Sequence, residues 1–153
     1  MAEPEIKLPS DQYYIRNGEL FAGRNHREDR SLLPKRVNCP TDGDLELWDL
    51  EQLPNGRYRL EARGSPTGAR NNLLYAFLID PSKAEEWIIT KRKVDRNRSL
   101  YTIEKADKTA GWVKQTGTEG PQIAVLPLRV IETPDGTPQF FPNALWNIQP
   151  LVN

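Results

Sequence analysis

The sequence predicts an all-β fold, and two observations support this. Thirteen prolines and ten glycines interrupt the 153 residues, so few windows keep apolar residues at helical spacing. Short apolar or alternating runs dominate instead, as is typical of the many short strands in a sandwich or barrel. The clearest runs are residues 57–63 (RYRLEAR), 73–79 (LLYAFLI) and 123–131 (IAVLPLRVI). Residues 82–86 (SKAEE) are long enough for one helical turn only.

Two short patterns each occur three times and refine this prediction. One is Tyr-x-Ile/Leu, in steps of 45 and 43 residues, and the other is Trp-x-Leu/Ile. They begin at Tyr13, Tyr58 and Tyr101, and at Trp48, Trp87 and Trp146. Residues at i and i+2 share one face of a strand, so all six segments can line one interior. Three pseudo-repeats of about 45 residues, each with four short strands, make a β-trefoil in which the last Trp strand pairs with the first Tyr strand.

Turn residues separate the Trp and Tyr strands. Pro54-Asn55-Gly56 lies between the first pair, and Asn-Gly readily adopts positive φ, which predicts a hairpin. Residues 95–98 fill the matching place in the next unit. The third unit is longer, because residues 117–122 and 133–143 add loop length. The repeated aromatic residues are expected in the core, and Trp112 is expected to begin a later strand of the third unit.

Length and charge limit the function classes. A chain of 153 residues suffices for a single domain with a core, in which residues 1–11 form an irregular N-terminal segment. Lys plus Arg and Asp plus Glu both number 21, so no net charge draws the molecule to nucleic acid or to an anionic membrane. The single cysteine, Cys39, is expected to be a small apolar side chain, and it excludes an internal disulfide.

The N-terminal residues MAEPEIKLPSD lack the apolar run of a signal peptide. No apolar stretch approaches the roughly 20 residues of a membrane-spanning helix. These features predict a cytoplasmic protein.

Residues suited to catalysis are sparse. His26 is the only histidine, so multi-histidine metal sites are excluded and a Ser-His-Asp arrangement would depend on this one residue. Gly-x-Ser-x-Gly and phosphate-binding Gly-rich motifs do not occur. Adjacent carboxylates such as Glu85-Glu86 face opposite ways on a strand, so they do not form an acid/base pair. We predict that the chain is not an enzyme and uses neither metal nor cofactor.

Two segments mix charges of both signs, residues 23–37 (GRNHREDRSLLPKRV) and 91–98 (KRKVDRNR). Acids interrupt both segments and neither contains an aromatic residue for base stacking, which argues against nucleic-acid binding. A solvated hairpin explains residues 91–98.

A carbohydrate-binding trefoil lectin is an alternative function. Ricin-type lectins carry Gln-x-Trp in each unit, whereas the corresponding triplets here are Glu-Leu-Trp, Glu-Glu-Trp and Ala-Leu-Trp. Because other trefoil lectins lack the motif, sugar binding stays open.

Residues 22–37 resemble the signature of the mushroom β-trefoil serine-protease inhibitors, the cospin-like family. Gly23-Arg24, a gap of three residues, and residues 28–37 (EDRSLLPKRV) carry the resemblance. It continues through four further segments, at 51–69, 78–89, 111–113 and 122–128, and so covers nearly the whole chain from about Gln12.

The resemblance implies a disulfide-free fungal trefoil that acts as a monomer and inhibits trypsin-like serine proteases. Inhibition runs through the loop between the second and third strands. Here that loop is residues 24–31, bounded by strands 19–22 and 35–39. Family members differ in the gap, which holds Asn25, His26 and Arg27 in this chain.

Arg27 is the residue expected to enter the protease. A trypsin-like enzyme has an aspartate at the floor of its specificity pocket, and an arginine can fill the pocket and pair with that carboxylate. Arg27 lies in the variable gap and is followed by Glu28, a poor neighbour for trypsin cleavage. Asn25, His26 and Glu28 complete the expected contact.

An inhibitory loop must be rigid, because a preformed loop avoids much of the ordering cost of binding. Without a disulfide, side chains have to supply the rigidity. We expect Glu28 and Asp29 to hydrogen-bond to loop amides and to Arg24 or Arg30. The apolar pair 32–33 is expected to anchor the end of the loop in the barrel.

Residues 64–72 (GSPTGARNN) are expected to form a second loop. In the more distantly related mycocypins, an asparagine in the equivalent loop inhibits asparaginyl endopeptidase, and Asn71 or Asn72 could imitate it. Inhibition of asparaginyl or cysteine proteases is therefore a further alternative, based on fold analogy.

Overall fold

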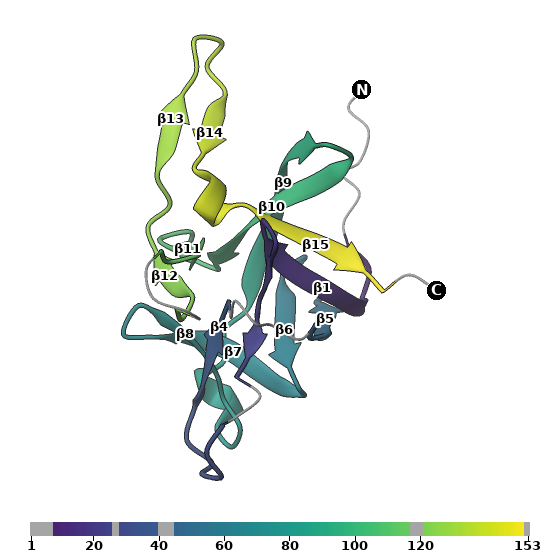
Figure 1. Ribbon diagram of the computed structural model, residues 1–153, viewed down its shortest axis with the longest axis vertical. Coiled ribbons are helices and arrows are strands. Elements are labelled where there is room, and N and C mark those ends of the chain that lie inside the picture. Colours follow the sequence, from purple (N-terminus) through teal and green to yellow (C-terminus); the bar gives the residue numbers. More distant parts are fainter. Residues whose placement is uncertain (1–7, 26–27, 40–44, 117–120, 152–153) are drawn as a thin grey trace.

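The computed structural model describes residues 8–25, 28–39, 45–116 and 121–151, and in these ranges it contains strands and two 3-10 turns but no α-helix (Figure 1). The all-β prediction is confirmed. The strands are β1 (Asp11–Asn17), β2 (Leu20–Phe21), β3 (Gly23–Arg24), β4 (Lys35–Asn38), β5 (Trp48–Gln52), β6 (Tyr58–Ala62), β7 (Ser65–Arg70), β8 (Leu73–Ala76), β9 (Trp87–Asp95), β10 (Arg98–Lys105), β11 (Gly111–Val113), β12 (Ala124–Leu126), β13 (Val130–Glu132), β14 (Pro138–Phe140) and β15 (Trp146–Pro150). The 3-10 turns are η1 (Pro81–Lys83) and η2 (Pro142–Ala144). Neither turn has the length or apolar character that a membrane-crossing helix needs.

Six strands pair in a closed ring. Around it, β1 pairs with β5, β5 with β6, β6 with β9, β9 with β10, β10 with β15, and β15 with β1 again. Ile15 lies opposite Ile148 where the last Trp strand meets the first Tyr strand, which is the pairing expected from the sequence. A closed ring leaves none of these six strands with an open edge along its whole length.

The repeated Tyr and Trp residues meet across strands at three places in the ring. The three cross-strand pairs are Tyr13 with Trp48, Tyr58 with Trp87, and Tyr101 with Trp146. The three Trp side chains and Tyr58 are buried, as expected, whereas Tyr101 is only partly buried at the edge of the core.

Trp112 has a larger part in the core than the sequence suggested. It lies within β11, it is fully buried, and its rings contact those of the three repeated tryptophans, at centroid distances of 5.5, 5.7 and 5.8 Å. Two of these contacts are edge-to-face, the arrangement that aromatic quadrupoles favour. Four indoles thus fill the centre of the ring. Cys39 is also fully buried, and burial raises the pKa of its thiol to about 12.

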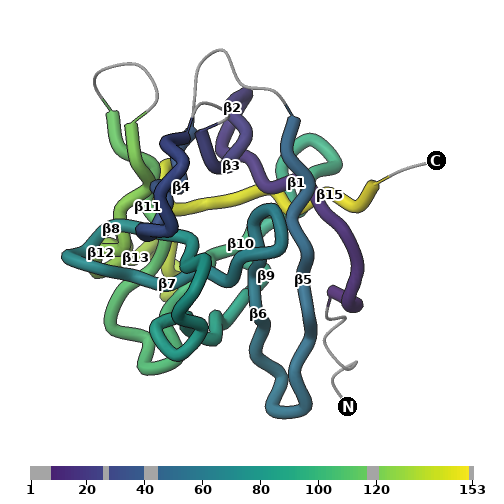
Figure 2. Tube along the Cα trace, turned by 90° about the horizontal axis from the view of Figure 1, so that it is seen from below, coloured from purple at the N-terminus to yellow at the C-terminus, as the bar shows by residue number. Residues whose placement is uncertain are grey.

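The predicted hairpin turns are present. Gly56 has a φ of 87° and donates its N–H to the Leu53 carbonyl at 2.9 Å, which closes the β5–β6 hairpin that extends from the body in Figure 2. Arg96 and Asn97, with φ of 51° and 66°, make the turn of the β9–β10 hairpin.

The apolar run over residues 123–131 contributes to two strands rather than to one. β12 ends at Leu126 and β13 begins at Val130, because Pro127 supplies no N–H to continue the ladder. β13 pairs with β14 as a separate two-stranded sheet that projects from one end of the molecule. Residues 28–34, which lead into β4, lie at the opposite end in Figure 1.

Candidate functional site

The candidate site is the loop that joins β3 to β4. Arg24 pairs with Val37 and therefore belongs to a strand, so the loop spans residues 25–34 rather than the expected 24–31. Of the expected strand 19–22 only Leu20–Phe21 is strand, as β2, and β3 follows it at Gly23–Arg24. His26 and Arg27 lie outside the described residues, and their assignment as contact residues stays a prediction. Asn25 is exposed at the start of the loop.

Arg24, directly before the loop, binds the side chain of Glu28 within it. Its Nε and Nη2 donate to the two carboxylate oxygens of Glu28 at 2.8 and 2.5 Å, and its Nη1 donates to the Ala62 carbonyl at 3.1 Å. Only 8% of Arg24 and 14% of the Glu28 side chain are exposed. This bidentate pair is shielded from water, so salt screens it little.

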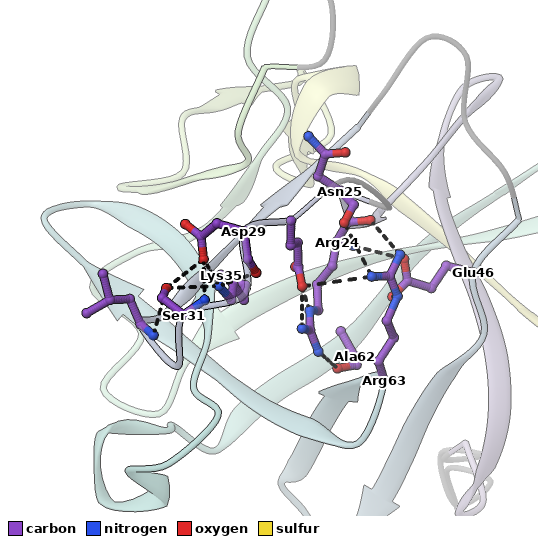
Figure 3. A network of polar contacts seen from close by, with 10 residues as sticks. Arg24, Asn25, Asp29, Ser31, Lys35, Glu46, Ala62 and Arg63 are labelled. Carbon is purple, nitrogen blue, oxygen red and sulfur yellow. Dashed lines mark hydrogen bonds and ion pairs between the residues drawn. The ribbon is translucent and has the colours of Figure 1, made fainter.

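Two residues that flank ring strands hold the same end of the loop, Glu46 before β5 and Arg63 directly after β6 (Figure 3). Glu46 accepts the Arg24 backbone N–H at 2.9 Å. Arg63 donates from Nη2 to the Arg24 carbonyl at 3.1 Å and from Nη1 to the Asn25 carbonyl at 3.3 Å. Arg63 also lies 3.3 Å from Glu46 and 3.9 Å from Glu28. We call Arg24, Glu28, Glu46 and Arg63 the entry anchor.

Gly23 makes room for the entry anchor. A Cβ at this position would overlap the Glu46 carboxylate, so only glycine lets Glu46 reach the backbone of Arg24. The pKa of Glu46 is raised above its ordinary value, because the effect of burial exceeds the opposing effect of the nearby Arg63. Its Oε1 accepts no hydrogen bond from the described residues and faces Arg63 as an ion pair only.

A second group holds the end of the loop. Lys35 is 6% exposed, and its Nζ donates to Asp29 Oδ1 at 2.5 Å and to the Asp29 carbonyl at 3.2 Å. The same Oδ1 accepts the Ser31 N–H at 2.9 Å and its hydroxyl at 2.6 Å. Hydrogen bonds from Lys35 and Ser31 lower the pKa of Asp29 to about 2. We call Asp29, Ser31 and Lys35 the exit anchor.

One expectation about this end of the loop is wrong, and another is confirmed only in part. Leu32 and Leu33 are 59% and 66% exposed, so they do not anchor the loop in the barrel. Polar groups do so instead, because the buried Lys35 ammonium needs oxygen partners and the loop supplies them. Asp29 accepts a loop amide, as expected, but its ion pair is with Lys35 rather than with Arg24 or Arg30. Arg30 is exposed and takes part in none of the ion pairs among the described residues.

The structure separates the predicted contact residues into two groups. Asn25 is exposed, whereas the carboxylate of Glu28 turns inward to Arg24. Sequence reasoning missed Glu46, Ala62 and Arg63, which come from the β5–β6 region and carry no local signal of a role in this loop. Lys35 falls within the quoted family signature, but nothing in the residues alone shows that it faces Asp29.

The expected second loop, residues 64–72, is mostly strand. β7 occupies Ser65–Arg70 and pairs with β8, which leaves only Asn71 and Asn72 as the turn, with φ of 53° and 62°. Both asparagines are exposed, and the Asn72 carbonyl accepts the Val125 N–H at 2.8 Å. They stand on a tight hairpin rather than on an extended loop.

No group of three or more His, Cys, Asp or Glu side chains within the described residues could hold a metal ion.

Comparisons with known proteins agree with the resemblance. The family model described as Peptidase inhibitor I66 matches residues 6–150. A serine protease inhibitor of Lentinula edodes is 38% identical over 109 residues, which make up 69% of this chain and 74% of that protein. The structure of a proteinase inhibitor from Coprinopsis cinerea matches with a TM-score of 0.80 at 27% identity, over 95% of this chain and 100% of the other. A salivary protein from Culex quinquefasciatus shares the fold alone, with a TM-score of 0.66 at 13% identity, over 96% of this chain and 97% of the other.

Proposed function

Because the chain belongs to the peptidase inhibitor I66 family, we propose that it inhibits trypsin-like serine proteases through the β3–β4 loop, with Arg27 in the specificity pocket. The family and the fungal relative are protease inhibitors rather than enzymes, and their partner is a protease.

The two-sided fixation of the loop is the observation that carries this proposal. Arg63 holds the carbonyls of Arg24 and Asn25, and Arg24 holds the side chain of Glu28. The span that contains Arg27 therefore joins two fixed points. A loop held in this way loses little conformational entropy when it binds, which is the condition for tight inhibition without a disulfide.

The burial and pairing of Arg24 argue against it as the residue that enters the protease. Arg24 is buried and committed to Glu28, so it is not free to leave the barrel. Arg30 lies beyond Asp29, next to the exit anchor. In the proposed complex Arg27 pairs with the aspartate of the specificity pocket, while Asn25 and His26 contact the protease on one side of it.

Glu28 has a different role in this proposal from the one expected. Cleavage after Arg27 would make the Glu28 amine the leaving group. Because Arg24 grips the Glu28 carboxylate through two hydrogen bonds, that amine would stay beside the acyl carbon. A retained amine attacks the acyl group at high effective concentration, so resynthesis of the bond competes with hydrolysis.

We also propose that the ring belongs to a β-trefoil of three pseudo-repeats, folded as a single domain that acts as a cytoplasmic monomer. The three Tyr–Trp pairs support the repeat. The indole N–H groups of the repeated tryptophans give further support, since they donate to residues 22, 67 and 112, which are spaced 45 residues apart.

Titration of trypsin with the purified chain tests the proposal. We expect inhibition at or below micromolar inhibitor, and Arg27→Ala should weaken it by about a thousandfold, as for a central binding residue. Arg30→Ala is the matched control, an exposed arginine of the same loop, and should leave inhibition within about threefold. No inhibition by the native chain, or full inhibition by Arg27→Ala, would refute the proposal.

A further inference from the structure

A shallow hollow of about 370 Å³ lies over the neighbouring ring strands β10, β15 and β1. The polar and aromatic residues around it include Arg16, Arg98, Tyr101, Asn147 and Gln149. Its volume falls at the lower end of the range for small-molecule sites, about 300–1,000 Å³, so it suits one compact ligand. The hollow lies on strands away from the β3–β4 loop in Figure 1, and it has no part in the proposed protease contact.

The hollow carries two positive charges without a counter-charge. None of the residues that line it is acidic, and neither Arg16 nor Arg98 has an ion-pair partner within the described part of the chain. Five other arginines are paired with glutamates, namely Arg24, Arg57, Arg59, Arg63 and Arg92. Arg16 and Arg98 differ from the remaining unpaired arginines of the described residues in that they share this hollow. Two guanidinium groups on one concave surface repel each other, and an anion placed between them removes that repulsion.

Arg16 is fixed in place by its neighbours. Its Nε donates to Asn147 Oδ1 at 3.2 Å, and its guanidinium lies 5.5 Å from the centre of the Phe21 ring. Asn147 is itself 7% exposed and donates to the Ser99 carbonyl at 3.1 Å. The amide orientation follows from this donation, so Asn147 presents its oxygen to Arg16. The two Nη groups of Arg16 take no hydrogen bond to the described residues and remain for a ligand.

The uncharged residues of the hollow suit a polyhydroxylated ligand. Asn97 and Gln149 offer amide donors and acceptors, which match hydroxyl groups. Tyr101 is half-buried there, and burial raises the pKa of its phenol, so the ring stays neutral and presents an apolar surface beside the arginines. Two cations, several amides and one aromatic ring together favour a sugar that bears a negative charge.

We propose that this hollow binds an anionic sugar unit, a pyranose with a carboxylate or sulfate group, held by Arg16 and Arg98. Three further exposed cations of the adjoining hairpin, Lys91, Lys93 and Arg96, have no ion-pair partner among the described residues. They add positive potential around the site and draw anionic chains toward it. The inference is independent of protease inhibition.

Calorimetric titration of the full chain with glucuronate tests this inference. Glucose and sodium sulfate are titrated at the same ionic strength, to separate the contributions of the sugar and of the charge. We expect millimolar affinity for glucuronate, the range that a ligand of this size reaches at an exposed site, and at least about tenfold weaker binding of glucose and of sulfate.

Arg98→Gln and Arg16→Gln should each weaken glucuronate binding by about tenfold or more, because each removes a charge-assisted hydrogen bond. Lys108→Gln is the control, an exposed cation outside both the hollow and the adjoining hairpin, and should change affinity by less than about twofold. Arg98 is exposed, so its variant tests the site even if Arg16→Gln disturbs folding. Equal binding by Arg98→Gln and the native chain, or equal binding of glucose and glucuronate, would overturn the proposal. Sulfate binding as tight as glucuronate binding would overturn the assignment to a sugar.

Discussion

The two mixed-charge segments of this chain, residues 23–37 and 91–98, have similar compositions but differ in how far their charged side chains are buried and paired. In the first segment the key side chains turn inward, with Glu28 14% and Lys35 6% exposed and both in ion pairs. In the second segment every residue is exposed, and Arg92 alone forms an ion pair with another described residue, Glu104.

Partners from distant parts of the chain make this difference. Three residues from the β5–β6 region bind the first segment at Arg24. Glu46 and Arg63 bind its backbone, and the Ala62 carbonyl binds its guanidinium. The second segment forms the outer part of β9 and the turn of the β9–β10 hairpin, and its strand residues pair with residues 98–101 of β10. The composition of a short charged segment therefore predicts neither rigidity nor exposure. The surface against which the segment packs determines both.

Removal of Arg24 should lower the free energy of unfolding more than any other change to the two segments. Arg24→Ala leaves the half-buried Glu28 carboxylate and the Ala62 carbonyl without their main partner, so we expect the free energy of unfolding to fall by about 3–5 kcal/mol. Urea denaturation measures this. Arg30→Ala, in the same segment but exposed, should change it by less than about 0.5 kcal/mol. Equal losses in the two variants would contradict the distinction between anchored and exposed charges.

Crowding at Gly23 should have the next largest effect. Gly23→Ala places a methyl group against the Glu46 carboxylate and should cost about 1–3 kcal/mol of unfolding free energy, as overpacking does. In a Glu46→Ala background the same change should cost much less, because the obstructing group is gone. A double-mutant cycle measures the coupling, and additive effects would show that Glu46 is not the obstacle.

The exit anchor should respond to acid. The pKa of Asp29 lies near 2 instead of the ordinary 3.8, so the ionised form is favoured by folding. Its stabilisation is present above about pH 4 and is lost as pH falls toward about 2. We expect the difference in Tm between the native chain and Asp29→Asn to shrink between about pH 5 and pH 2. A difference that stays constant over this interval would contradict the bond between Lys35 and Asp29.

Neutralising the second segment should have the smallest effect. Lys91 and Lys93 are exposed and make no ion pair with the described residues, so Lys91→Gln with Lys93→Gln should change the unfolding free energy by less than about 0.5 kcal/mol. Trypsin inhibition by this double variant should match that of the native chain. Loss of inhibition would show that the β9–β10 hairpin takes part in protease binding.

The sequence was most informative where one residue type repeats at strand spacing. The Tyr and Trp patterns predicted the strands that carry them, because an aromatic residue with an apolar neighbour two positions on lines one face of a strand. The sequence predicted a loop where β7 lies, because Ser65, Pro66 and Gly68 are residues typical of turns. Gly68 is needed for another reason, since a Cβ there would lie 2.6 Å from the Lys83 carbonyl of η1.

The site was predictable only as far as its own segment reaches. The pairing of Arg24 with Glu28 spans four residues and was among the expected contacts. The contributions of Glu46 and Arg63 arise because β5 and β6 pass behind the loop, and no local pattern reports such a meeting of distant segments. The burial of Lys35 was likewise hidden, because lysine is rarely buried without a partner and its partner is an exposed aspartate.

The closure of the ring has a consequence for biosynthesis. Ile15 of β1 pairs with Ile148 of β15, so the first strand waits for a segment more than 130 residues later in the chain to leave the ribosome. At ordinary elongation rates that wait lasts on the order of ten seconds, during which β1 keeps an open edge on that side. The ring therefore cannot close before β15 has been made, and nascent chains are open to chaperones, or to one another, until then.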